Sequence, residues 1–221
     1  MMQVRIGLEQ RISMSQMTGL EIVRMRRGQF AATREMLTRA FLDYPLMKYA
    51  NAHLAPRRRG VATLYGAIVL DTLRHGEVHV SAGLEGACCW LPPGVGLPTF
   101  AREVRSGMLG LPFGFGWAGF QRLAKFDQVQ RRLHERYAIG PHWFLATIGV
   151  DPAHQGRGIG SALLAPVLAR ADEQRVCCYL ETHAADNVRL YERHGFRVME
   201  HIENPATVPL WAMLRPPVAA S

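Results

Sequence analysis

The sequence predicts a mixed α/β (α+β) fold in which helices flank a central, mostly antiparallel sheet. Residues 144–150 form a nearly continuous apolar run, which is typical of a strand covered on both faces. Residues 77–82 and 87–91 are separated by a Gly-Leu-Glu-Gly turn and predict an antiparallel hairpin. Apolar side chains recur at helical spacing in 30–41 and 57–74. With 221 residues and 48% hydrophobic content, the chain can bury one sizeable core without disulfides or metals.

The chain is expected to form one domain. Residues 1–18 show no clean periodicity and are interpreted as a mobile extension, whereas 216–221 read as a loose tail. The domain between them, 19–215, opens with a strand near 20–25. Residues 100–137 favour helix but are interrupted by glycines and a proline. The remaining strands are expected at 176–181, 196–199 and 210–214, with a helix after 183–187 that Asp186 would cap and Gly195 would end.

The net charge of +8 and the pI near 9.9 suit an acidic ligand. The arginines are scattered, and the single run at 57–59 has no aromatic residues beside it, so no nucleic-acid partner is expected. The two adjacent cysteine pairs, 88–89 and 177–178, lack metal-ligand spacing and are interpreted as reduced thiols. No stretch has the roughly 20 apolar residues of a membrane span. A cytoplasmic protein with no membrane partner is therefore expected.

A glycine-rich turn follows the apolar strand and precedes an amphipathic helix. Asp151 and Pro152 end the strand. The turn and helix start then comprise Gln155, Gly156, Arg157, Gly158, Ile159, Gly160 and Ser161. Glycines let successive backbone N–H groups approach an anion, and a helix N-terminus favours negative charge. The turn is neither a Walker loop, which requires a lysine before Ser161, nor a dinucleotide fingerprint, whose spacing is one residue longer. A phosphate site is predicted, with a plain strand-to-helix turn as the alternative.

This spacing resembles the acyl-CoA pyrophosphate loop of the GNAT acetyltransferase superfamily. Downstream, residues 180–196 resemble the superfamily's fifth strand, fourth helix and helix-ending Gly-Phe. The likeness is greatest to puromycin N-acetyltransferase-like members, through AFLDYP at 40–45, the WFLAT run and Trp211-x-Met213. The likeness does not extend through residues 94–140, approximately. The resemblance implies a GNAT-like sheet with a splayed parallel strand pair, and acetyl-CoA as the acyl donor. No metal is expected, because His142, His154, His183 and His194 lack metal-ligand spacing.

The resemblance also implies roles for particular residues. The pyrophosphate would lie on Gln155 to Ser161, and the pantetheine arm along the strand at Ile148, Gly149 and Val150. Tyr191 would be the general acid that protonates the departing thiolate, and Asn187 would contact pantetheine. These two residues are four apart, so a helix presents them on one face, which supports the pair independently.

The general base and the acceptor site are less defined by sequence. Many superfamily members carry a glutamate on the strand equivalent to 144–150, but none occurs there. Glu181 is the best remaining carboxylate, acting directly or through water, and a purely structural carboxylate is the alternative. The glycine and aromatic content of 97–140 suggests that this segment selects the acceptor. Tyr44, Phe113 and Trp117 are the expected acceptor-binding side chains.

The sequence thus predicts an acetyl-CoA-dependent N-acetyltransferase that moves an acetyl group directly to the primary amine of a small molecule. The alternative is a non-catalytic acyl-CoA-binding sensor or regulatory module. The small-molecule amine is the expected partner. The sequence leaves open whether the chain forms a homodimer.

Overall fold

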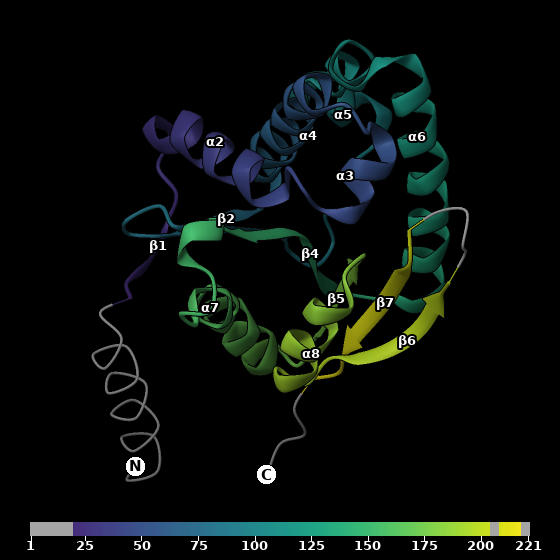
Figure 1. Ribbon diagram of the computed structural model, residues 1–221. Helices are drawn as coiled ribbons and strands as arrows, with labels where there is room; N and C mark the ends of the chain where they lie inside the picture. Colours follow the sequence, from purple (N-terminus) through teal and green to yellow (C-terminus); the bar gives the residue numbers. More distant parts are fainter. Residues whose placement is uncertain (1–19, 204–207, 218–221) are drawn as a thin grey trace, which may run out of the picture.

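A seven-stranded mixed sheet organises the computed structural model, which describes residues 20–203 and 208–217. The strand order is β1-β2-β3-β4-β5-β7-β6, and every neighbouring pair is antiparallel except β4 and β5. The strands are β1 (Ile22–Arg24), β2 (Glu77–Ser81), β3 (Gly86–Leu91), β4 (His142–Val150), β5 (Cys177–Thr182), β6 (Arg197–Ile202) and β7 (Leu210–Arg215). The predicted fold class is confirmed (Figure 1). The proposed extension 1–18 lies outside the described residues, as does 218–221 of the tail.

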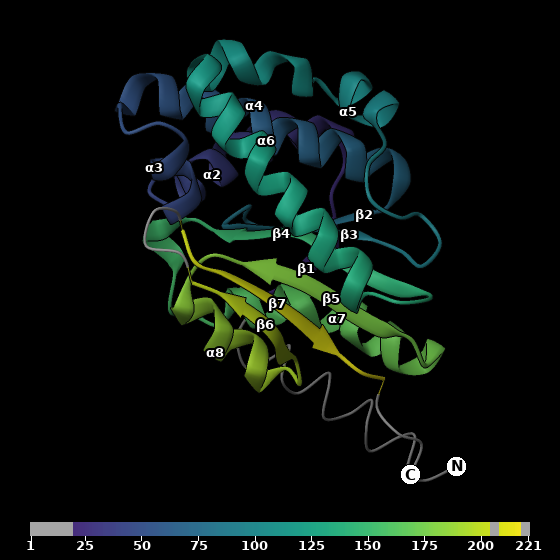
Figure 2. The same ribbon diagram turned by 90° about the vertical axis from the view of Figure 1, so that its right-hand side faces the viewer.

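Helices cover both faces of the sheet. Figure 2 shows α2 to α6 on one face and α7 with α8 on the other. The helices are α2 (Phe30–Phe41), α3 (Pro45–Ala50), α4 (Leu54–His75), α5 (Phe100–Ser106), α6 (Leu111–Tyr137), α7 (Ile159–Gln174) and α8 (Ala185–Arg193). Short 3₁₀ turns lie at η1 (Arg27–Gln29), η2 (Met108–Gly110) and η3 (Pro152–His154). No helix of the described chain is both long enough and apolar enough to cross a bilayer.

Strand β4 contributes to two cores, because its side chains alternate between the faces of the sheet. Phe144 packs with the α2 to α6 layer, whereas Trp143 and Leu145 belong to the core under α7. Gly149 faces α2. A Cβ there would lie 2.8 Å from Leu37 and 2.8 Å from Phe41, so this glycine permits α2 to approach the strand.

The parallel pair opens partway along its length. β4 and β5 pair only where His142 to Leu145 face Cys177 to Leu180, while the rest of β4 continues to pair with β3. The N–H of Asp151 donates to the Glu85 carbonyl (2.7 Å) on the β3 side. Because backbone groups alternate along a strand, Ile148 and Val150 direct theirs toward the side from which β5 has diverged. The predicted splay between the parallel strands β4 and β5 is therefore confirmed.

The prediction that glycines interrupt the helical segment 100–137 is confirmed, because α5 and α6 are separate helices and α6 itself consists of two helical stretches that meet at a kink at Gly116 (φ 75°, ψ 164°). Pro45 occupies the first position of α3, where a missing N–H costs nothing, so a new helix begins directly after Tyr44. The prediction that Asp186 caps α8 is wrong: Ala184 is the N-cap residue and no side chain caps it. Asp186 lies in the first turn, where its charge still favours the helix dipole.

Candidate active site

The glycine-rich turn between β4 and α7 is open and shaped for an anion. Gly156 (φ 76°) and Gly158 (φ 78°) both adopt left-handed backbone, and Gly158 is the N-cap residue of α7. A Cβ at either position would meet nothing within 4 Å. The turn therefore requires glycine for conformation, while the space above it stays free. Backbone N–H groups at a helix start can bind a phosphate in that space.

The other predicted turn residues differ in what their side chains do. Ile159 is buried in the core, and Gly160 lies against Leu190 of α8, so both face the protein. Ser161 Oγ lies 2.9 Å from His194 Nε2. Arg157 is exposed beside the turn. These placements leave the main chain of the turn and the Arg157 side chain as the groups that can face an anion.

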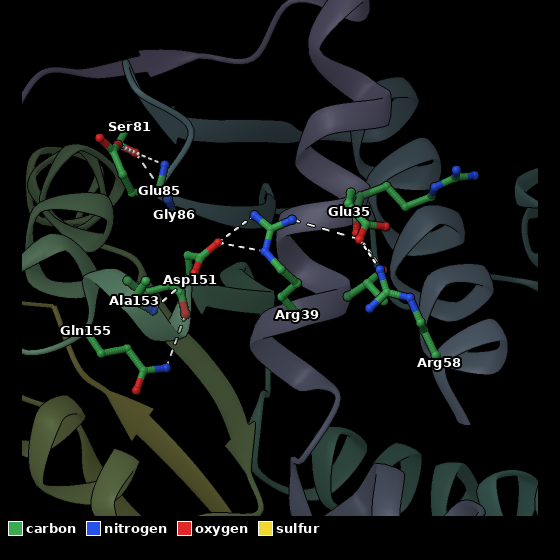
Figure 3. Close-up of polar contacts among 12 residues, drawn as sticks. Glu35, Arg39, Arg58, Ser81, Glu85, Gly86, Asp151, Ala153 and Gln155 are labelled. Carbon is green, nitrogen blue, oxygen red and sulfur yellow. Dashed lines mark hydrogen bonds and ion pairs between the residues drawn. The ribbon is translucent and has the colours of Figure 1, made fainter. Parts of the chain in front are cut away.

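Polar contacts from α2 and β4 hold this turn in place (Figure 3). Arg39 of α2 binds one carboxylate oxygen of Asp151, and the other oxygen accepts the Ala153 N–H (3.1 Å). The Arg39 contact lowers the pKa of Asp151, so this carboxylate is ionised at neutral pH. Gln155 Nε2 donates to the Val150 carbonyl (3.2 Å), so the Gln155 side chain closes the turn onto the strand end.

A cavity of about 530 Å³ begins at the open end of the strand pair and extends beneath α4, α5 and α6. At the strand end, its walls include Ile148 of β4 with Asn187 and Tyr191 of α8. Its apolar lining includes Phe41, Leu46, Met47, Leu64, Tyr65, Ile68, Leu111, Phe120 and Leu123. This volume is within the usual range for a small-molecule site.

Two of the expected acceptor-binding residues do not line this cavity. Phe113 is 84% exposed and Trp117 is 64% exposed, and neither is part of the wall. Close packing explains their direction: a Cβ at Gly114 would lie 2.6 Å from Gly60 of α4, so this glycine face of α6 contacts α4. Phe113 and Trp117 consequently point outward, and Phe120 from the following turns lines the cavity instead.

Tyr191 and Asn187 occupy one end of the cavity, as their helical spacing predicted. Tyr191 is 4% exposed and packs edge-on against Phe196. Burial raises the pKa of the Tyr191 phenol well above its usual value, so the hydroxyl keeps its proton at neutral pH. Asn187 Nδ2 donates to Thr182 Oγ1 (3.2 Å), which fixes the amide against the end of β5.

Tyr44 lines the cavity and also joins its two sides. The His183 N–H donates to the Tyr44 hydroxyl oxygen (2.8 Å), and Thr182 Oγ1 lies 3.2 Å from the same oxygen. Burial raises the pKa of Tyr44, so it is a neutral phenol in this network. Sequence reasoning missed Thr182, because a threonine at a strand end carries no motif. Its importance comes from the contact with both Tyr44 and Asn187.

Glu181 is partly buried on β5 and faces the cavity. Tyr179 donates its hydroxyl proton to one carboxylate oxygen (2.7 Å), and Gln130 Nε2 donates to the other (2.8 Å). Burial outweighs these two hydrogen bonds and raises the pKa of Glu181 from 4.5 to about 7. A carboxyl group with this pKa can accept and release a proton near neutral pH.

These groups follow one another along the opened strands. The turn at 155–160 can hold phosphates, and Tyr191 can donate a proton. The Ile148 backbone and the Val150 N–H can bind an extended chain, whereas the Val150 carbonyl already accepts from Gln155. The register that pairs His142 with Cys177 would, if extended, set Glu181 level with Ala146. The arrangement therefore supplies an anion site at the turn after β4, and a proton donor and a proton acceptor in the wall of the cavity.

Comparison with known proteins shows the family of this chain. Residues 115–196 match the model of the acetyltransferase (GNAT) family. A GCN5-like protein acetyltransferase of Mycobacterium tuberculosis is 31% identical over 163 residues, which cover 68% of this chain and 78% of that protein. The chain therefore belongs to the GNAT family and is an N-acetyltransferase.

Two solved structures share the fold. The structure of histone acetyltransferase HPA2 and related acetyltransferase from Corynebacterium glutamicum aligns with a TM-score of 0.65 at 22% identity, over 91% of this chain and 98% of that chain. A putative acetyltransferase from Salmonella typhimurium, solved with its cofactor acetyl-CoA, aligns with a TM-score of 0.50 at 18% identity, over 91% and 96% of the two chains. Both confirm the fold class.

Proposed function

We propose that this chain transfers the acetyl group of acetyl-CoA directly to the primary amine of a small, largely apolar molecule. The observation that carries the proposal is the cavity of about 530 Å³, which joins Tyr191 and Ile148 at one end to an apolar chamber under α4, α5 and α6. A cavity of this size with a mainly apolar lining suits a small ligand.

Acetyl-CoA as donor is supported by the features of the 155–160 turn. Gly156 and Gly158 leave the backbone open, α7 starts there, and Arg157 adds positive charge beside it. The Salmonella typhimurium neighbour was solved with acetyl-CoA, and its fold is the same. The splay leaves the backbone of Ile148 and the N–H of Val150 facing the gap, where the amide groups of the pantetheine arm can bind.

In the proposed reaction the acceptor nitrogen attacks the thioester carbonyl, a C–N bond forms and the C–S bond breaks. The Glu181 carboxylate accepts a proton from the ammonium form of the acceptor, directly or through water, which frees the nitrogen lone pair to attack. The new C–N bond leaves a surplus proton on the nitrogen, and this proton passes to water as the tetrahedral intermediate collapses to the amide. A backbone N–H on β4 stabilises the oxyanion. Tyr191 gives its proton to the departing thiolate. The proton on Glu181 returns to solvent, and that of Tyr191 is replaced from solvent.

The apolar lining also favours an acceptor of the puromycin type, an amine attached to a bulky aromatic or aliphatic body. Phe41, Tyr65 and Phe120 are the aromatic walls for such a body. Tyr44, which belongs to the segment that resembles puromycin N-acetyltransferase-like members, lies where this chamber meets the strand opening.

A thiol-release assay with acetyl-CoA and a panel of amines tests the proposal. The panel contains alkyl amines, aralkyl amines and peptides with free lysine or N-terminal amines. We expect kcat/KM for the best small apolar amine to exceed that for every peptide by at least about tenfold. Higher values for peptides would contradict the substrate class. Tight acetyl-CoA binding by calorimetry with no turnover on any amine would instead favour the sensor module.

A further inference from the structure

Helix α5 and the turn before it form part of the cavity wall, and a glycine stands at each end of this segment. The lining residues that the segment contributes are Leu97, Pro98, Phe100, Glu103, Val104 and Ser106. Gly94 (φ 87°) precedes it and Gly107 (φ 98°) follows it, both in left-handed backbone. The chain is anchored beyond each glycine, because Leu91 is buried at the end of β3 and Met108 packs against the larger core. Residues 95–106 therefore lie between two possible hinges.

Apolar packing contributes little to holding residues 95–106 in place. None of them belongs to either apolar core of the described chain. Phe100 is 75% exposed and Val104 is 37% exposed, although both line the cavity. Their side chains are thus accessible to a ligand and to solvent at the edge of the cavity. Because this apolar surface is already exposed, movement of α5 away from the cavity would expose little more of it.

Arg102 ties the segment together and also joins it to α4. Its Nε and Nη2 atoms bind the carboxylate oxygens of Asp71 on α4 at 3.0 Å and 2.6 Å. Its Nη1 atom donates to the carbonyl oxygens of Val95 (3.3 Å) and Gly96 (3.5 Å) in the turn before α5. The turn and the helix are therefore linked as one body, which places the first hinge at Gly94.

Two further arginines hold the segment against its neighbours, beside α4 in the helical layer (Figure 2). Arg131 of α6 binds Glu103 and donates to the Pro98 carbonyl oxygen (3.1 Å). Arg74 of α4 donates to the Arg105 carbonyl oxygen (2.8 Å). Water can replace such polar partners when they separate, so the net contribution of each contact to the stability of the closed position is small.

We propose that residues 95–106 form a lid, hinged at Gly94 and Gly107, which closes over the apolar body of the bound acceptor. Phe100 and Val104 are the apolar side chains of α5 that line the cavity, so they are the ones that the lid brings onto the acceptor. Removal of their exposed surface from water favours closing. Phe100 is consequently a specificity-determining residue for acceptors that reach α5. The inference rests on the proposed function and adds the element that covers the acceptor.

Two alkyl amines of different length test the role of Phe100. We expect Phe100→Ser to lower kcat/KM for 1-aminooctane about tenfold and for 1-aminobutane less than about twofold, with the acetyl-CoA KM unchanged. Phe113→Ser is the matched control, because Phe113 is also an exposed phenylalanine but does not line the cavity. An equal change for both amines, or the same effect in Phe113→Ser, would overturn the assignment.

A cross-link tests whether the lid has to move. In the variant Arg74→Cys/Arg105→Cys, a short bis-maleimide joins α4 to α5, whereas N-ethylmaleimide caps the same thiols without joining them. Cys177→Ser is included in both samples, because Cys177 is the native cysteine that is not buried. We expect kcat/KM for 1-aminooctane to be at least about tenfold lower in the cross-linked protein than in the capped protein, with the same acetyl-CoA Kd. Equal values of kcat/KM would show that α5 is a fixed wall.

Hydrogen exchange provides a readout that needs no turnover. In the free protein, the amides of 97–106 should exchange at least about tenfold faster than those of α4. CoA together with 1-aminooctane, which cannot react, should slow them. Exchange of 97–106 as slow as that of α4 in the free protein would overturn the lid. If no amine in the thiol-release panel is acetylated, the proposed function fails, whereas exchange in the free protein still decides whether the lid opens.

Discussion

Arg39 and Asp151 join α2 to the end of β4, with Arg39 Nε and Nη2 at 2.9 Å and 2.5 Å from the same carboxylate oxygen (Figure 3). The two residues lie far apart in sequence. Asp151 uses its other oxygen to cap the 3₁₀ turn that leads to the glycine-rich turn. The contact therefore couples the position of α2 to the place where the pyrophosphate is proposed to bind.

Replacing Arg39 with leucine should weaken acetyl-CoA binding modestly. Arg39 is half exposed, and an ion pair of this kind contributes about 0.2–1 kcal/mol, so a Kd increase of at most about fivefold is expected by calorimetry. Arg58→Leu is a matched control, because Arg58 binds Glu35 in the same cluster but does not contact Asp151. An equal change in both variants would contradict a specific role of the Arg39 contact.

Tyr191→Phe should lower kcat by about 10²- to 10⁴-fold, because the ring and its packing remain but the proton donor is lost. The acetyl-CoA Kd and the melting temperature should change little. Tyr137→Phe serves as the control, since the Tyr137 hydroxyl binds Glu200 and Tyr137 does not line the cavity. A fall in kcat of less than about threefold, with chemistry rate-limiting, would remove Tyr191 from the mechanism.

The rate should depend on the ionisation of Glu181. Since burial raises the pKa of Glu181 to about 7, kcat/KM should rise with pH through about 7 as the carboxylate forms. This rise is the limb of the pH profile that we assign to Glu181. Glu181→Gln should remove the limb and lower kcat/KM. Tyr179→Phe deletes a hydrogen bond that favours the carboxylate, so the limb should move to higher pH. A limb that is unchanged in both variants would exclude Glu181 as the base.

The same pKa has a consequence for stability. The folded pKa of about 7 exceeds the ordinary value of 4.5, so the folded state favours the protonated carboxyl group. The contribution of Glu181 to the free energy of unfolding is therefore fully present below pH 4.5, and it is lost as the pH rises through 7. Glu181→Gln should therefore gain melting temperature relative to wild type between pH 5 and pH 8, as measured by calorimetry.

Phe120 should affect the acceptor, whereas Phe113 and Trp117 should not. Phe120 lines the cavity, while the other two side chains face outward. Phe120→Ala should raise the acceptor KM about tenfold or more through lost apolar contact, with the acetyl-CoA KM unchanged. Phe113→Ala and Trp117→Ala should leave both KM values within about twofold. Larger effects of the exposed residues on the acceptor KM would restore them to the acceptor site.

The local part of the site could be predicted from sequence because it depends on short spacings. Gly156 and Gly158 are needed wherever the backbone turns left-handed before a helix, and Asn187 and Tyr191 share a helix face by their four-residue spacing. The nearly continuous apolar run at 144–150 likewise predicted a strand between two layers, and β4 covers it. Each of these features is determined by neighbours in the chain, so it is visible in the sequence.

The contacts of the acceptor cavity were decided by tertiary structure. Tyr44, Thr182 and Asn187 meet because α2, β5 and α8 converge, and no sequence spacing connects them. Phe113 was misplaced because a glycine-rich, aromatic segment indicates packing without indicating which face of the helix is buried.

The sequence by itself determined the order of strand, glycine-rich turn and helix. Only the tertiary structure decided that the pKa of Glu181 rises to about 7. The physical reason is that protonation depends on burial and on hydrogen-bond partners from other elements. Tyr179 and Gln130 supply those partners from β5 and α6.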